Sequence, residues 1–107
     1  MRVSGRSARE RVVDIRASAR PHKKYEALVR GPHGLRSVHF GDRRYSQFRD
    51  ATRLGLYSAR DHGDAERRRR FLRRHAGTPS KNEALRIERA RSGGRVTPRY
   101  LSIRYLW

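Results

Sequence analysis

A run of arginines is the densest group of side chains in this sequence that could perform binding chemistry. Residues 67–70 are all arginine, and Arg73 and Arg74 follow within about one helical turn. An arginine guanidinium grips phosphate with two parallel hydrogen bonds and stacks on flat rings. Successive residues of a helix are turned by about 100°, so most of these side chains share one side, which we call the cationic ridge: Arg67, Arg69, Arg70, Arg73 and Arg74. The pattern predicts that this ridge tracks a polyanion such as a phosphate backbone.

The remaining arginine of the run, Arg68, falls on the opposite, apolar arc that contains Phe71. An arginine turned toward a core needs a carboxylate partner, and Asp42, Asp50 and Asp61 are the candidates. The alternative interpretation of the whole run is a solvated helix face. Like charges on neighbouring turns repel one another, so an arginine-rich face without a partner would be destabilised.

A second basic group lies around the first apolar segment of the chain. Its members are expected to contact nucleic acid as well: Lys23, Lys24, Arg36, Arg43 and Arg44. Tyr25, Tyr45 and Phe48 are interleaved with these basic residues. Aromatic rings beside arginines can stack on exposed bases. The chain has few other large apolar residues, so we expect the three rings to lie in the core instead.

Histidines and acids raise the question of a metal or catalytic site. The candidate ligands are His39, His62, His75, Asp61 and Asp64. The triplet at 62–64 does not match the helical spacing of a zinc site. Ser58 near Asp61 and His62 could suggest nucleophilic chemistry, but capping and hydrogen bonds within the fold explain the latter two. A small nuclease or metal enzyme is the third hypothesis, and we expect no catalytic residue, metal or cofactor.

The composition favours a polyanionic partner. The 107 residues carry 28 basic side chains against 10 acidic ones, a formal net charge of +18, and all but three of the basic residues are arginine. Such a charge repels itself in the compact state, and phosphate backbones would neutralise it. Arginine-rich codon usage would explain part of the bias without a function. An acidic protein surface or an anionic membrane could also replace nucleic acid.

The sequence also argues against other classes of protein. It has no cysteine, which excludes disulfides and thiolate metal sites. No apolar run approaches the ~18 residues of a membrane span, and the first residues lack the apolar core of a secretory signal. We therefore expect a protein that is neither inserted in a membrane nor secreted.

The predicted organisation is a flexible basic arm followed by one small domain. Residues 1–22 are rich in Arg, Ser and Ala and are expected to be disordered. The alternative is a helix with one side formed by Ala8, Val12, Ile15 and Ala19. Residues 23–107 form the domain, which begins with a β-hairpin over 23–40 and a turn at 31–34. An isolated hairpin is marginal in water, so it must pack against later helices.

The end signals of those helices are local. The clearest helix spans 61–77, with Asp61 or Gly63 as its N-cap and Gly77 just past its end. A second helix opens with a capping-box pattern at residues 80–83. A third begins with Thr97 and Pro98, although its apolar residues also alternate as in a strand.

These elements predict an α+β fold, a small single domain in which a β-hairpin is packed by two or three short helices. The core is expected to contain Tyr25, Val29, Val38, Phe40, Tyr45, Phe48, Leu54, Leu56, Tyr57, Phe71, Leu72, Leu106 and Trp107.

A long motif in the middle of the chain resembles a known family. Residues 38–50 read VHFGDRRYSQFRD, followed by LGLYS at 54–58, DHGD at 61–64 and the ending YLSIRYLW at 100–107. The pattern is similar to that of a family of small basic proteins of unknown function encoded by nucleocytoplasmic large DNA viruses. The similarity covers about residues 23–75 and the last eight residues.

The resemblance implies a viral protein located in the virion, or in the viral factory or nucleus of the host cell. The family provides no established catalytic residues, so the implied role is non-enzymatic. One implied function is low-specificity binding of nucleic acid, DNA rather than RNA, for genome packaging. The other is a minor capsid or scaffold protein whose arm passes between acidic capsid subunits and whose tail, residues 105–107, docks on a partner.

Overall fold

The structure is a computed structural model, and it describes residues 9–107 of the chain. The prediction of a disordered arm lies outside the described residues for positions 1–8. From the start of the described part, the strands are β1 (Arg11–Ala17), β2 (Lys23–Gly31) and β3 (Gly34–Asp42). A 3₁₀ turn, η1 (Ser58–Arg60), precedes the helices α2 (Ala65–Ala76), α3 (Lys81–Arg91) and α4 (Pro98–Tyr105).

The predicted hairpin is confirmed as the pair β2 and β3. Tyr25 lies opposite Phe40 and Ala27 lies opposite Val38 in an antiparallel register. All four side chains are buried, because alternate residues of a strand point to the same face. Gly34 closes the turn with a φ of 106°, a backbone conformation that residues other than glycine rarely adopt.

The strand β1 corrects the prediction of a disordered arm. Residues 11–17 pair antiparallel with β2, so the described part of the chain forms a sheet in the order β1-β2-β3. Val12 lies opposite Val29 and Ile15 opposite Ala27, with Val13 as an extra residue that shifts the register. This β-bulge turns Val12 and Ile15, three residues apart, to the same face. Both pack against the core, and the same spacing had suggested a helix.

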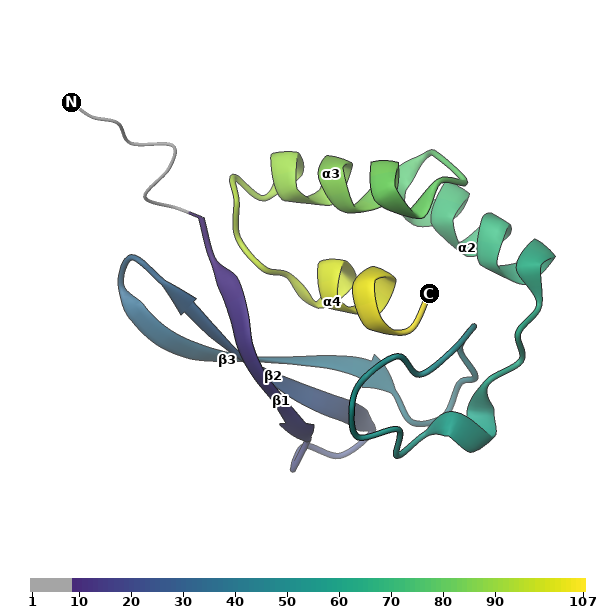
Figure 1. Ribbon diagram of the computed structural model, residues 1–107, viewed down its shortest axis with the longest axis horizontal. Coiled ribbons are helices and arrows are strands. Elements are labelled where there is room, and N and C mark those ends of the chain that lie inside the picture. The colour runs from purple at the N-terminus through teal and green to yellow at the C-terminus, as the bar shows by residue number, and fades with distance from the viewer. Residues whose placement is uncertain (1–8) are drawn as a thin grey trace.

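The helices cover one face of the sheet (Figure 1). Helix α4 lies between β3 on one side and the α2–α3 pair on the other. Two clusters of buried residues reflect this layering. Leu101 and Leu106 of the α4 region join the sheet cluster, whereas Ile103 joins Leu72 and Ala84 of the helices. The α+β class is therefore confirmed, with β1 added to the predicted hairpin.

The core prediction is confirmed for the strand residues and for two leucines of the helical part, and it is wrong for three residues of the loop after β3. Tyr25, Val29, Val38, Phe40, Leu72 and Leu106 are buried. Tyr45, Leu54 and Leu56 are 63%, 43% and 57% exposed. These three lie between β3 and η1, where polar side chains rather than apolar packing hold the chain. Phe48, Tyr57, Phe71 and Trp107 are half-buried.

Helix α2 begins at Ala65, later than predicted. The side chain of Asp64 is its N-cap and accepts from the backbone N–H groups of Glu66 and Arg67. Asp61 is not the cap, because its carboxylate is hydrogen-bonded within the preceding loop. Gly77 ends the helix as predicted, in the left-handed conformation with a φ of 76°.

The other helix starts follow the predicted signals. The Ser80 side chain accepts from the Glu83 backbone N–H at the start of α3. The Thr97 side chain accepts from the Tyr100 backbone N–H, with Pro98 in the first turn of α4. The last apolar segment is therefore a helix and not a strand. Within residues 9–107, no helix has the length and apolar character that a membrane crossing requires.

Candidate nucleic-acid interface

Buried polar side chains position the irregular segment that leads to α2. Gln47 is 1% exposed. Its Nε2 atom donates to the carbonyl oxygen of Tyr57 at 2.8 Å and to Asp61 Oδ1 at 2.6 Å. Asp61 Oδ1 also accepts from the Asp50 backbone N–H at 2.8 Å. The Gln47 side chain thus connects positions 10 and 14 residues further along the chain.

Tyr25 extends this network from the sheet into the loop. Its hydroxyl donates to the carboxylate of Asp50 and accepts from the Leu56 backbone N–H at 2.9 Å. Asp50 also accepts from the hydroxyl of Thr52 at 2.6 Å. Burial and the hydrogen bond to Asp50 raise the pKa of Tyr25 to about 12, so the phenol stays a neutral donor. The network fixes the loop and, through it, the start of α2.

Lys24 belongs to this network and not to the surface. It is 1% exposed, and its Nζ atom donates to the Tyr45 carbonyl oxygen at 2.9 Å and to the side chain of Gln47. Burial lowers the pKa of Lys24. The prediction that Lys24 contacts nucleic acid is therefore wrong, because its ammonium group faces the interior.

Arg36 forms a structural ion pair. Its guanidinium donates to both carboxylate oxygens of Glu10, at 2.6 and 2.9 Å, and to the Val96 carbonyl oxygen at 2.7 Å. The contact joins the residue before β1, strand β3 and the segment before α4. Arg36 therefore connects distant parts of the chain, a role that its place among the predicted phosphate ligands did not anticipate.

Arg43 and Arg44 lie on the surface but are hydrogen-bonded to neighbouring groups. Arg43 donates to the carbonyl oxygens of Lys23, at 2.7 Å, and Ser18, at 3.0 Å. Arg44 donates twice to the carboxylate of Asp42, at 2.7 and 3.0 Å. Such exposed pairs are weak, so a phosphate could displace the Asp42 partner of Arg44. Arg43 is instead oriented toward the end of the sheet.

The ridge arginines of α2 differ in their partners. Arg69 pairs with Glu66 one turn earlier, and Arg67 donates to the Ser46 hydroxyl at 3.2 Å. The rest of the ridge is exposed and has no carboxylate partner among residues 9–107: Arg70, Arg73 and Arg74. The predicted ridge is thus formed, with Arg69 partly neutralised.

Arg68 is turned away from the ridge as predicted, but its predicted carboxylate partner is wrong. Its guanidinium carbon lies 4.6 Å from the centre of the Phe48 ring. Within the described residues, its Nε atom is buried without a hydrogen-bond partner. A cation over a ring face is stabilised by the ring quadrupole, which substitutes for the ion pair. Asp50 and Asp61 are engaged in the loop network instead.

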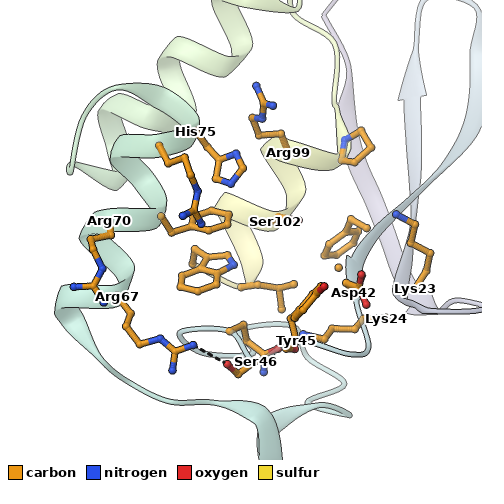
Figure 2. Close-up of a pocket in the computed structure, with 18 residues that line it drawn as sticks. Lys23, Lys24, Asp42, Tyr45, Ser46, Arg67, Arg70, His75, Arg99 and Ser102 are labelled. Atoms are coloured by element: carbon orange, nitrogen blue, oxygen red, sulfur yellow. Dashed lines mark hydrogen bonds between the residues drawn. The ribbon is translucent and has the colours of Figure 1, made fainter.

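The ridge borders a groove between the sheet end, α2 and α4 (Figure 2). The groove has a volume of about 690 Å³. Basic side chains line it from separate elements: Lys23 of β2, Arg67, Arg70 and Arg74 of α2, and Arg99 of α4. Figure 2 shows Arg67 and Arg70 on the opposite side of the groove from Lys23. Positive charge therefore surrounds a concave surface, which concentrates anionic ligands.

Aromatic rings form the apolar part of this groove. The rings of Phe71 and Trp107 stack with centres 4.1 Å apart and planes at 5°. His75 lies against Phe71 with ring centres 4.3 Å apart. Burial, followed by the charges of Arg99 and Arg74, lowers the pKa of His75. At neutral pH His75 thus contributes a ring and not a charge.

Lys23, Arg67, Arg70 and Arg74 of this groove are among the residues that the sequence predicts to bind nucleic acid. Arg99 is not among them, and Trp107, which the sequence places in the core, lines the groove. Pro98 indicates the start of a helix, but the sequence does not indicate which residues of other elements lie opposite Arg99. Arg99 and Trp107 come close to the basic residues of β2 and α2 because α4 packs between the sheet and α2. The periodicity and local spacing of the sequence do not predict that packing.

Comparison of the chain with models of protein families, with curated proteins and with solved structures finds no match. Within residues 9–107, no cluster of three or more His, Asp or Glu side chains has an arrangement that could hold a metal ion.

Proposed function

We propose that this protein binds nucleic acid without catalysis, by contacts of arginine side chains with phosphates and with low sequence specificity. The observation that carries the proposal is the ridge of α2. Four of its exposed arginines have no carboxylate partner within residues 9–107: Arg67, Arg70, Arg73 and Arg74. All of these except Arg73 line the basic groove. Each repelling pair on neighbouring turns costs roughly 0.2–0.5 kcal/mol, and phosphates would turn that repulsion into attraction.

DNA is the proposed partner, and the resemblance to proteins of large DNA viruses supports genome packaging as the setting. Location in the virion, the viral factory or the host nucleus is part of the same proposal. The charge of +18 on 107 residues favours a role in neutralising a dense polyanion.

The alternative of a capsid or scaffold protein has less support. It expected the tail to dock on a partner, but Leu106 is 2% exposed and Trp107 stacks on Phe71 within the same molecule. Much of this tail is therefore packed within its own molecule, and Trp107 also lines the groove. An acidic capsid surface could still meet the ridge, and the experiment below includes this outcome.

The test measures the affinity of the purified protein for labelled duplex DNA by fluorescence anisotropy over a range of NaCl concentrations. We expect the logarithm of the association constant to fall linearly with the logarithm of salt. Arg73→Ala should weaken binding to all sequences alike and reduce the slope by about 0.9, the contribution of one phosphate.

Arg53→Ala is the control, because Arg53 carries the same charge outside α2, its side chain is 90% exposed, and it already has a carboxylate neighbour, Asp14, at 3.7 Å. It should change the slope less than Arg73→Ala does. A slope near zero, or equal effects of the two variants, would contradict the proposal. Binding to an acidic polypeptide such as polyglutamate but not to DNA would favour the capsid alternative.

A further inference from the structure

The groove beside the ridge has a concave shape and an aromatic lining that phosphate binding does not require. A phosphate-tracking surface needs exposed positive charge, which the ridge supplies without any cavity. Here a concave space of about 690 Å³ lies next to the ridge and is partly lined by aromatic and apolar side chains. That volume falls within the ~300–1,000 Å³ of pockets that enclose small organic ligands.

The groove combines two kinds of contact in one place. Trp107 stacks on Phe71 and still lines the groove, and Tyr45, which is 63% exposed, lies at the groove beside Ser46. Flat rings of this kind stack on nucleobases whatever their sequence. Cations such as Arg70 and Arg99 line the same groove, and guanidinium groups hold phosphates by paired hydrogen bonds.

Electrostatics favours an anion with an aromatic part over an anion alone. Among the described residues, the lining includes one acid, Asp42, and Arg44 already pairs with its carboxylate. That pairing lowers the pKa of Asp42. The lining of Lys23, Arg67, Arg70, Arg74 and Arg99 thus remains strongly positive around an apolar interior.

We propose that the groove holds an unpaired nucleotide of a nucleic-acid strand, with its base against the aromatic lining and its phosphate among the surrounding arginines. This proposal rests on the proposed function and adds to it a preference for unpaired strands over duplex. In duplex DNA the flat faces of the bases are stacked on one another, so the duplex exposes phosphates and base edges but leaves no base face free for an aromatic ring. The protein should therefore bind single strands, or strand ends, more tightly than duplex of equal charge.

Trp107 is the single tryptophan of the chain, so its fluorescence reports directly on the groove. The test titrates the full-length protein with an oligothymidylate and with an abasic oligomer of the same length and phosphate number. The oligothymidylate should quench Trp107 fluorescence and bind about five- to a hundred-fold more tightly, the effect of stacking one base. The abasic oligomer should bind by charge without comparable quenching.

Two variants on the same helix separate the groove from the ridge. Arg70 lines the groove, whereas Arg73 does not, and both are exposed on α2. Arg70→Ala should reduce the ratio of the oligothymidylate affinity to the abasic affinity. Arg73→Ala should weaken both ligands equally and leave the ratio unchanged.

The outcomes distinguish this proposal from the proposed function. Equal affinity and equal quenching for the two oligomers would overturn the nucleotide site but leave phosphate binding intact. Failure of both oligomers and of duplex DNA to bind would overturn both proposals. Thymidine monophosphate is the third ligand: quenching by it at concentrations similar to those of the oligomer would show that free nucleotides and not strands occupy the groove.

Discussion

At the scale of single residues, the carboxylate of Glu10 connects strand β3 to the segment before α4. It is 8% exposed, and Oε1 accepts from Arg36 at 2.6 Å and from the Val96 backbone N–H at 2.9 Å. The hydrogen bond from Arg36 is the main reason that the pKa of Glu10 is lowered from 4.5 to about 2. The ionised carboxylate therefore stabilises the folded chain.

Replacement of this carboxylate should be costly and pH-dependent. Glu10→Gln should lower the free energy of unfolding at pH 7 by about 1–3 kcal/mol, the cost of leaving hydrogen-bonding groups of a half-buried pair unsatisfied. A lowered carboxyl pKa stabilises the fold above the unfolded value of 4.5, and this stabilisation is lost as pH falls toward about 2. The difference between wild type and variant should therefore shrink over that window, as measured by urea unfolding.

The control for that experiment is Glu83→Gln, which breaks the exposed pair between Glu83 and Arg86. Exposed pairs contribute at most about 1 kcal/mol, so this variant should be close to wild type. A Glu10→Gln variant as stable as Glu83→Gln at pH 7 would show that Arg36 is not a structural residue.

At the scale of elements, polar groups hold the segment between β3 and α2. The hydroxyl of Tyr25 contacts both Asp50 and the Leu56 backbone N–H, so one atom joins β2 to two points of the loop. Loops supported in this way open locally when a supporting group is removed. The exposed residues Arg53 and Arg60 of this segment are sites at which trypsin would detect such opening.

Tyr25→Phe should therefore loosen the loop more than it perturbs the sheet. We expect a loss of about 1–3 kcal/mol in unfolding free energy and faster tryptic cleavage after Arg53 and Arg60. The matched control is Tyr57→Phe, because the Tyr57 hydroxyl has no hydrogen-bond partner among the described residues. Equal cleavage rates for the two variants would contradict the role of the Tyr25 hydroxyl.

The helices and strands also differ in how well the sequence predicts them. The ends at Gly77, Ser80 and Thr97 were predictable because a cap acts on backbone groups within about four residues of itself. Strand β1 was missed because the composition of residues 1–22, rich in Arg, Ser and Ala, indicates disorder, and because the bulge at Val13 replaces the alternation of a strand by the spacing of a helix. Local spacing does not reveal the register that produces such a bulge.

The candidate site was predictable in part for the same reason. The ridge follows from the 3.6-residue period of α2 alone, and its five arginines are exposed as the period predicts. Their contact with phosphates stays a prediction. Lys24 looked like its neighbour Lys23, but its position opposite Gln47 depends on a loop that folds back over the sheet. The groove requires β2, α2 and α4 together, so its residue Arg99 carries no local signal.

At the scale of the whole molecule, charge opposes compaction. The chain carries a formal net charge of +18, and the fold has a radius of gyration of only 14.2 Å. At about 0.1 M ionic strength the Debye length is about 10 Å, so charges on opposite sides are screened but neighbours along the ridge are not. The folded state thus carries a repulsion that the extended chain relieves.

Salt should therefore have opposite effects on stability and on binding. The midpoint of thermal unfolding should rise as NaCl increases from about 0.02 to 0.5 M, because screening weakens the repulsion between arginines. Over the same range the affinity for DNA should fall, because releasing the same counterions into a more concentrated salt solution gains less entropy. At low salt, a short oligonucleotide should raise the midpoint by binding the folded state, and this increase should vanish at high salt.

Sucrose at matched osmolality is the control, because it stabilises folded proteins by exclusion from their surface and screens no charge. A midpoint that is constant or falls with NaCl would mean that ion pairs such as Glu10 with Arg36 outweigh the repulsion. In that case the ridge would not need a partner to relieve it. The stability argument for a polyanion would then fail, even if the protein bound DNA.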